Sequence, residues 1–231
     1  MNSEEILKVL MDCELIITGR LVDASNATLF GNLANTEELK VIYKPVAGER
    51  PLWDFPVGTL AEREYAAYLF SEEFGFNLVP TTVLRDGPYG YGMVQQWIEN
   101  AQPSNLIEIA QGNDVQLRRM FLFDVLINNG DRKFGHILLA EAGKILGCDH
   151  GVSFHVADKL RTVLWQFAGL LLTENELSLL DNIANSDLSF LSNYLTETEI
   201  SALLERTRRL INQENFPQPA DDRPSIPWPP V

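Results

Sequence analysis

Cysteines, basic side chains and long apolar runs are all scarce in this sequence. The 2 cysteines, Cys13 and Cys148, stand far apart and outside any CxxC spacing, so they predict neither a disulfide framework nor a zinc site. This usage fits a reducing compartment such as the cytoplasm. No apolar run approaches the roughly 20 residues that span a bilayer, and the N-terminus carries acids where a secretory signal carries bases. We therefore expect a soluble, cytoplasmic protein without membrane insertion.

Positive charge is in the minority. The sequence has 18 lysines and arginines against 32 aspartates and glutamates, which gives a formal net charge of -14. Such a surface repels phosphate backbones and anionic lipids over a Debye length of about 10 Å. Nucleic acid is therefore not an expected partner.

The chain is long and apolar enough to fold unaided. With 231 residues, 45% of them hydrophobic, it is able to form one substantial core or two small lobes that share a cleft. We assign residues 1–215 to a single domain. The remaining residues, 216–231, include six prolines and predict a disordered or polyproline-like tail.

The hydrophobic pattern divides this domain into a strand-rich half and a helical half. The expected strands are three antiparallel runs between residues 14 and 46, two more joined by the Gly87-Pro88 turn, and a small hairpin within residues 137–148. The expected helices cover residues 3–11 with Ser3 as N-cap, 60–75, 115–129 and 163–172, and two more begin at the capping-box sequences near Thr173 and Thr196. This order predicts an α+β fold with an antiparallel β N-lobe, about residues 12–100, and a mainly helical C-lobe, about residues 101–215.

Four polar residues stand out, although each has an ordinary explanation. Lys44 lies in an apolar strand, where a lysine usually snorkels or marks an edge, and Glu64 lies on an amphipathic helix whose acids are usually solvated. Asp131 follows an Asn-Asn-Gly sequence typical of a turn, and Asp149 begins an Asp-x-Gly sequence that is also common in turns. The argument for function therefore rests on their order and spacing.

That order is the one phosphoryl transfer requires. The reaction needs a cation on the nucleotide phosphates, an acid that holds this cation, a carboxylate near the acceptor hydroxyl and ligands for magnesium. Lys44 on a strand, Glu64 on the next helix, Asp131 after a hinge-like stretch and finally Asp149 follow one another as in kinases. The constellation predicts a bilobal, protein-kinase-like fold that binds ATP and Mg²⁺.

The sequences that carry this order are VIYKPVAGERPLWDFPVGTLAEREYAAYLF, LINNGDRKFGHILL, CDHGVSFH and KLRTVLWQF. Through them the chain resembles, from about residue 17 to residue 165, the atypical kinases related to phosphatidylinositol 3- and 4-kinases (PI3K/PI4K-like), in particular a bacterial subgroup related to the SCO1664 family. The resemblance implies that Lys44 contacts the α and β phosphates and that Glu64 pairs with Lys44. It also implies that Asp131 and Arg132 form the catalytic Asp-Arg pair and that Asp149 binds the metal.

The same resemblance implies the rest of the nucleotide site. Ser25 and Asn26 fall in the loop that covers the phosphates, where backbone N–H groups are able to cradle them. Gln96, Trp97 and Ile98 fall in the strand that links the lobes, where they are expected to meet adenine.

Two features depart from that family. His136 stands where relatives usually carry asparagine, and a nitrogen ligand suits magnesium less well than an oxygen ligand does. Either the metal is then held mainly by Asp149, or Mn²⁺ is preferred, or activity is weak. In addition, Asp149 is followed almost at once by a predicted helix, which leaves no room for the long activation segment that positions peptide substrates in ordinary protein kinases.

Three functions are open at this point. The leading hypothesis is an ATP-dependent phosphotransferase that acts on a hydroxyl of an unidentified small molecule or protein. The second is a catalytically silent nucleotide-binding module with a regulatory role, which His136 favours. The third, metal-dependent hydrolysis with His136, His150 and His155, has little support because neither a cysteine ligand nor an HExxH spacing accompanies them.

Overall fold

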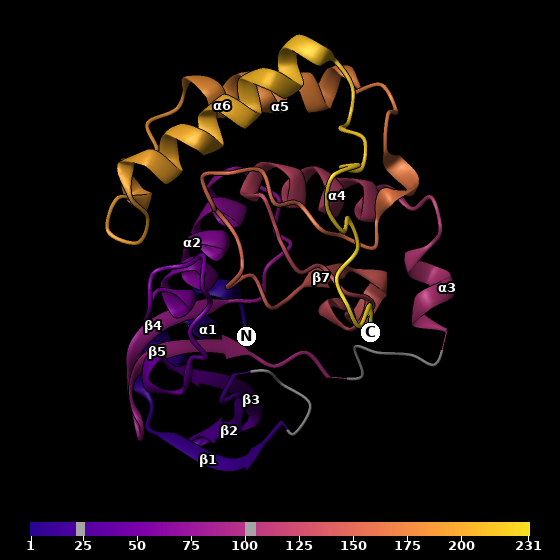
Figure 1. The fold of residues 1–231 in the computed structure, drawn as a ribbon. Helices are drawn as coiled ribbons and strands as arrows, with labels where there is room; N and C mark the ends of the chain where they lie inside the picture. The colour runs from indigo at the N-terminus through magenta and orange to yellow at the C-terminus, as the bar shows by residue number, and fades with distance from the viewer. Residues whose placement is uncertain (22–25, 100–104) are drawn as a thin grey trace.

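The two halves of the chain form different kinds of structure in the computed structural model, which describes residues 1–21, 26–99 and 105–231. The first half is a sheet with two helices, and the second half is mainly helical (Figure 1). The strands of the first half are β1 (Leu15–Arg20), β2 (Leu29–Leu33), β3 (Thr36–Pro45), β4 (Thr82–Gly87) and β5 (Gly90–Gln96), and its helices are α1 (Ser3–Asp12) and α2 (Leu60–Glu73). This division confirms the predicted α+β class.

The sheet has 5 strands in the order β1-β2-β3-β5-β4, with antiparallel neighbours throughout. Strand β3 is central, and successive side chains of a strand point to opposite faces. Val41 and Tyr43 are buried with Leu10 of α1 on one face. Lys44 consequently points to the other face, toward α2. The alternation therefore decides that this lysine reaches the helix rather than the core under α1.

Helix α2 is buried on more than one side. Its residues Ala66, Ala67 and Phe70 belong to the same hydrophobic core as Phe121 and Phe123 of the second half of the chain. The helix thus lies between the sheet and the helical lobe, which is why side chains from its first turns are able to reach both.

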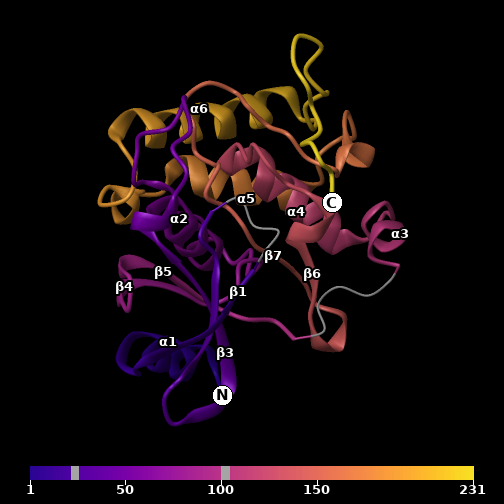
Figure 2. The same cartoon turned by 60° about the horizontal axis from the view of Figure 1, so that its bottom comes forward.

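The helical lobe is built around the buried helix α4 (Val115–Ile127). Its other helices are α3 (Leu106–Ala110), α5 (Glu174–Asn185) and α6 (Glu197–Gln213), and a hairpin consists of β6 (Ile137–Leu139) and β7 (Ile145–Gly147). Helices α5 and α6 lie on the side of α4 that faces away from the sheet (Figures 1 and 2). Both begin with a complete capping box, at Thr173 and at Thr196, as predicted. Among the described residues, no helix combines the length and apolar character needed to cross a membrane.

Two local predictions were wrong. The expected helix over residues 163–172 is reduced to one 3-10 turn, Trp165–Phe167, because this apolar segment pairs its backbone with residues 214–216 after α6. There the N–H of Gly169 donates to Phe216 O and the N–H of Leu172 donates to Glu214 O. The N-cap of α1 is Asn2 rather than Ser3, since the Asn2 side chain accepts from the N–H of Glu5 at 2.9 Å.

The proline-rich tail, expected to be a disordered or polyproline-like extension, instead lies against the helical lobe. Phe216 is buried, and the Ser225 carbonyl accepts hydrogen bonds from Thr162 N at 3.0 Å and from Trp165 Nε1 at 2.8 Å. Further on, the Pro230 carbonyl accepts from Phe134 N at 2.8 Å. Proline lacks an N–H but keeps its carbonyl acceptor, so a proline-rich segment still docks when donors face it.

Candidate active site

Lys44, Glu64 and Asp149 meet at one point from three different elements. The Nζ of Lys44 lies 2.5 Å from Glu64 Oε1 and 2.7 Å from Asp149 Oδ1. The second oxygen of Glu64 accepts a hydrogen bond from the N–H of His150 at 2.8 Å. The structure therefore brings together a strand, a helix and the segment after β7, although these lie up to 105 positions apart in the chain.

Burial and charge act against each other in this cluster. Burial lowers the pKa of Lys44, but Asp149 and Glu64 outweigh it and hold the pKa above its ordinary value. Burial raises the pKa of Asp149, yet the charges of Lys44 and His136 hold it well below its ordinary value. For Glu64 burial prevails, so its pKa is raised despite the adjacent lysine. The site thus holds a fixed cation beside an ionised carboxylate.

Asp131 lies at the same cavity. The cavity has a volume of about 30 Å³ and its lining includes Lys44, Glu64, Asp131, Asp149 and Asn26. Asp131 sits in the turn that follows α4: its N–H donates to Asn129 Oδ1 at 3.0 Å, and its Oδ2 lies 3.2 Å from Lys133 Nζ. The predicted turn is therefore present, and it places Asp131 in the lining of the cavity.

Arg132 points away from the cavity. Its guanidinium is fully buried and donates to Asp124 Oδ2 at 3.0 Å, to Asp124 Oδ1 at 2.9 Å and to the carbonyls of His136 and Cys148 at 3.1 and 3.0 Å. Its Nη2 also lies 2.7 Å from Nε2 of His150. Arg132 therefore joins the turn after Asp131 to the segment before His150, and it contacts protein groups rather than open space.

His136 and Asp149 are the side chains that could hold a divalent metal. The Nε2 of His136 lies 3.3 Å from Asp149 Oδ2, and burial lowers the pKa of His136, which favours the neutral imidazole that metals bind. The Nδ1 of His136 is buried without a hydrogen-bond partner among the described residues. One carboxylate and one imidazole fit a cation that takes its remaining ligands from phosphate oxygens and water.

Asp149 has an uncommon backbone conformation, and its neighbour Cys148 has a thiol whose pKa is raised. Asp149 has φ 59°, in the left-handed region that aspartate tolerates better than most residues. The thiol of its neighbour Cys148 has its pKa raised to about 12 by burial and by the charge of Asp149. Cys148 is therefore protonated at neutral pH when no metal is bound.

The three histidines of the hydrolase hypothesis face different partners. His136 faces Asp149, His150 bonds to Arg132, and Nδ1 of His155 accepts a hydrogen bond from the N–H of Ala157 at 2.9 Å. Their geometry offers no argument for a shared metal.

Ser25 and Asn26 are the residues predicted to cover the nucleotide phosphates. Ser25 lies outside the described residues. The side chain of Asn26 lines the cavity and accepts a hydrogen bond from the N–H of Arg50 at 2.8 Å. This ties the end of the predicted phosphate loop to the segment after β3.

The predicted adenine residues follow at the end of β5. The N–H groups of Gln96 and Trp97 donate to Thr81 O and Lys40 O, each at 2.9 Å, and the Trp97 ring packs edge-on against Phe30 at 5.2 Å. Gln96, Trp97 and Ile98 are half-buried, and they are not among the described residues that line the cavity.

Sequence reasoning missed Glu49 and Asp124. Glu49 lines the cavity and accepts from the N–H groups of Leu60 and Ala61, at 3.2 and 2.8 Å, at the start of α2. An acid in the loop before a helix was a usable signal, because carboxylates favour helix N-termini. Asp124 gave no such signal, since only the tertiary structure pairs it with Arg132.

Comparison with known structures identifies the class of fold as that of the atypical kinases. The chain matches hydra Fam20 with a TM-score of 0.62 and 15% identity, over 91% of this chain and 87% of that one. It matches a Golgi casein kinase with Mn/ADP bound with a TM-score of 0.59 and 13% identity, over 91% and 75%. It also matches the Helicobacter pylori proinflammatory kinase CtkA with a TM-score of 0.52 and 13% identity, over 89% and 94%. These likenesses confirm the predicted bilobal kinase-like fold.

Sequence comparison gives the family. No family model matches the sequence. Protein Rv2133c of Mycobacterium tuberculosis is 41% identical over 263 aligned positions, which cover 96% of this chain and 94% of that protein. The chain belongs to the family of Rv2133c.

Proposed function

We propose that this chain is an ATP-dependent phosphotransferase that transfers the γ-phosphate of ATP to a hydroxyl group. The observation that carries the proposal is the convergence at one cavity of Lys44, Glu64 and Asp149, joined at 2.5 and 2.7 Å, with Asp131 in the lining. A cation paired to a helix acid, beside two further carboxylates, is the arrangement that phosphoryl transfer uses.

The residues predicted from the sequence have distinct roles in this proposal. Lys44 binds the nucleotide phosphates, and Glu64 holds the lysine in place. Asp131 orients the acceptor hydroxyl and accepts its proton. Arg132 acts as a positioning residue, because its buried guanidinium fixes the backbone on either side of the cavity. The loop residues Ser25 and Asn26 cover the nucleotide phosphates, and Gln96, Trp97 and Ile98 contact adenine.

Asp149 and His136 are the proposed ligands of a divalent metal, either Mg²⁺ or Mn²⁺. Such a metal, when bound, supplies positive charge against the phosphate oxygens. The kinase-like neighbour with Mn/ADP bound supports the choice of nucleotide and metal. An imidazole beside a carboxylate favours Mn²⁺ over Mg²⁺, since magnesium prefers oxygen ligands.

The acceptor is proposed only as a class. A small polar molecule or a protein side chain fits the acidic composition better than an anionic lipid does, because a net charge of -14 repels lipid phosphates. The proposal also includes membership of the PI3K/PI4K-like kinases and a cytoplasmic location.

The test is the Asp131→Asn variant. We expect ATP turnover, assayed with Mg²⁺ and with Mn²⁺ over metabolite pools and protein lysate, to fall by about 100-fold or more, which is the usual contribution of a general base. ADP affinity by calorimetry should stay near the wild-type value. Turnover that survives the substitution contradicts the role of Asp131. If the wild-type protein does not bind nucleotide, the whole proposal fails.

A second candidate function is a silent nucleotide-binding module. His136, whose Nε2 lies 3.3 Å from Asp149 Oδ2, favours it, because a nitrogen ligand suits magnesium less well than an oxygen ligand does. Nucleotide-induced thermal stabilisation without ATP consumption, in the presence of either metal, selects this function over the first.

A further inference from the structure

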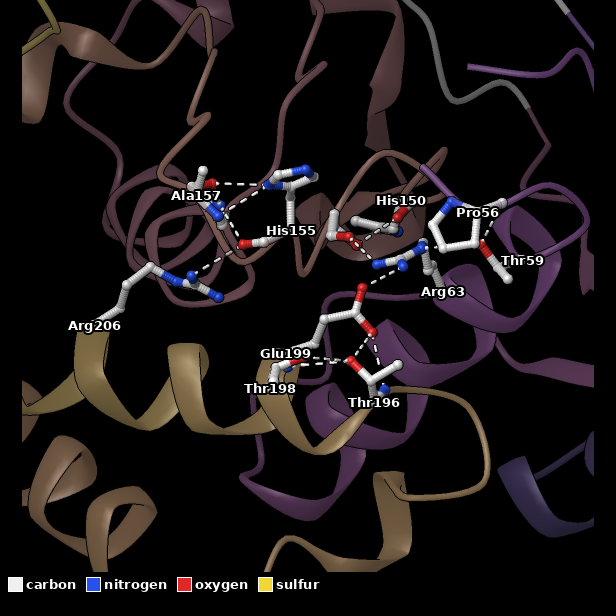
Figure 3. A network of polar contacts seen from close by, with 12 residues as sticks. Pro56, Thr59, Arg63, His150, His155, Ala157, Thr196, Thr198, Glu199 and Arg206 are labelled. Carbon is white, nitrogen blue, oxygen red and sulfur yellow. Dashed lines mark hydrogen bonds and ion pairs between the residues drawn. The ribbon is translucent and has the colours of Figure 1, made fainter. Parts of the chain in front are cut away.

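Arg63, which precedes the predicted site residue Glu64 on α2, crosses between the two lobes. Its Nη1 donates to the carbonyl of Ser153 at 2.8 Å, and its Nη2 is paired with Glu199 Oε1 (Figure 3). The side chain is 2% exposed. Because adjacent residues of a helix point about 100° apart, Glu64 reaches toward β3 while Arg63 reaches the helical lobe.

The partner of Arg63 is itself fixed in place. Glu199 is the third residue of α6 and completes its capping box, and its Oε2 accepts from the N–H and the hydroxyl of Thr196, both at 2.9 Å. Burial raises the pKa of Glu199, but Arg63 and Thr196 outweigh it and hold the pKa below its ordinary value. One oxygen of the Glu199 carboxylate thus completes the capping box of α6, and the other pairs with Arg63 of α2.

Ser153 connects this pair to the cavity. Its hydroxyl donates to the carbonyl of His150 at 2.6 Å, while the N–H of His150 donates to Glu64 Oε2 at 2.8 Å. Consecutive residues of α2 therefore form hydrogen bonds with the same short segment: Glu64 with His150 and Arg63 with Ser153. A rotation or outward shift of the first turns of α2 breaks both hydrogen bonds together.

We propose that the buried Arg63–Glu199 pair is an inter-lobe brace that holds the first half of α2 where Glu64 meets Lys44. The later residues of α2, Ala66 to Phe70, are already anchored in the hydrophobic core. Leu60 and Ala61 of the first turn are buried outside that core, and polar contacts of Arg63 and Glu64 also hold this part of the helix. The brace thereby sets the affinity of the cavity for nucleotide, a consequence that rests on the proposed function.

The chain contains a matched control for this brace. Glu176 holds the same position in the capping box of α5, where Thr173 N donates to it at 2.8 Å, and it pairs with Arg118 at 2.8 and 2.7 Å. The chemistry is the same, but Arg118 comes from α4, so this pair lies wholly inside the helical lobe. Glu176→Gln therefore reproduces the loss of one carboxylate–arginine pair without touching α2.

The experiment compares Glu199→Gln with Glu176→Gln in the full chain. Glutamine is accepted at this capping-box position, so both helices should keep their starts. Amide exchange by mass spectrometry reports on residues 60–66, and calorimetry measures the affinity for ADP with Mn²⁺. We expect Glu199→Gln to speed exchange in residues 60–66 and to weaken ADP binding by about tenfold, within the usual range of coupling between sites. Glu176→Gln should leave both values close to wild type.

Three further variants separate positioning from simple loss of stability. Arg63→Met should reproduce the effects of Glu199→Gln, and the double variant should weaken ADP binding no more than Arg63→Met alone, because the two side chains act as one unit. Arg63→Lys keeps the charge but not the fork that reaches two acceptors, so it should restore binding only in part.

Two results overturn the brace: equal effects of the two glutamine variants on residues 60–66, or unchanged exchange there when Glu199 or Arg63 is replaced. Failure of the proposed function is a distinct outcome, because it shows as wild-type protein that does not bind ADP. The exchange of residues 60–66 tests the brace even in that case.

Discussion

The dipeptides Asp131-Arg132 and Asp149-His150 each contribute one side chain to each of two neighbouring clusters. The first member of each dipeptide faces the cavity, and the second turns into the interior. We call the group at the cavity the cleft cluster: Lys44, Glu64, Asp131 and Asp149. We call the group behind it the frame cluster: Asp124, Asn129, Arg132 and His150.

The two clusters differ in how completely the protein satisfies them. In the frame cluster, the side chains of Asp124 and Arg132 are 0% exposed, and the Asn129 amide donates to Asp124 Oδ1 at 2.9 Å. In the cleft cluster, the side chains of Asp131 and Asp149 are 24% and 40% exposed. Asp124, Asn129 and Arg132 therefore have their partners within the protein, although Nδ1 of His150 is buried without a hydrogen-bond partner among the described residues. Asp131 and Asp149 of the cleft instead keep lone pairs accessible to a ligand. Loss of a frame residue should reduce stability, and loss of a cleft residue should reduce binding.

The largest expected effect is on stability, from Arg132→Met. The substitution leaves Asp124 buried without its cation, and breaking a buried pair in this way costs about 3–5 kcal/mol. Urea unfolding measures this loss. The control is Arg118→Met, whose pair with Glu176 is partly exposed and should contribute far less. Equal losses of unfolding free energy in the two variants would contradict the distinction between the buried frame cluster and the partly exposed Arg118–Glu176 pair.

The next effect is on binding, from Lys44→Met. Removing a charged donor from phosphate oxygens should weaken ADP affinity by about 10- to 100-fold, measured by calorimetry. Its loss of stability should be smaller than that of Arg132→Met, because Asp149 is open to water and Glu64, whose pKa is raised by burial, is able to take up a proton. A variant that unfolds as readily as Arg132→Met would place Lys44 in the frame rather than the cleft.

A smaller effect is expected from His136→Asn. An amide oxygen in place of the imidazole suits magnesium better, so the ratio of Mn²⁺-supported to Mg²⁺-supported ADP affinity should fall by about tenfold or less. Titration of each metal in the presence of ADP measures this ratio. An unchanged ratio means that Asp149 holds the metal without His136.

Acid pH should affect the stability of the frame cluster and leave the ion pair of the cleft cluster in place. Burial and Arg132 hold the pKa of His150 well below 6.5, so the folded frame keeps this histidine neutral. Below that pH the unfolded chain binds a proton that the folded chain does not, and stability falls by at most about 1.4 kcal/mol per pH unit. The pKa of Asp149 is also lowered, so the cleft ion pair with Lys44 persists over this range.

The check is His150→Gln, which keeps an acceptor for Arg132 and removes the titration. Between about pH 7 and pH 5, its unfolding free energy should depend less on pH than that of the wild type. Equal pH dependence in urea unfolding would show that His150 is not the group responsible.

Local patterns were predictable where neighbours in sequence determine them. The strand that carries Lys44, the capping boxes at Thr173 and Thr196 and the turn before Asp131 all appear in the structure. The run over residues 163–172 was not predictable, because its backbone bonds to residues 214–216 rather than to its own next turn. The docked tail was missed for the same reason, since its partners Thr162, Trp165 and Phe134 lie far from it in sequence.

The sequence by itself determined the order of strand lysine, helix acid and two aspartates, because periodicity and turn chemistry act over a few residues. Only the tertiary structure decided which member of each dipeptide meets the cavity, that Arg132 is sealed against Asp124, and that Arg63 joins α2 to α6. The physical reason is that burial and ion pairing between distant segments depend on how helices and strands pack. A charged side chain is exposed or enclosed according to that packing, and its own sequence neighbours do not fix it.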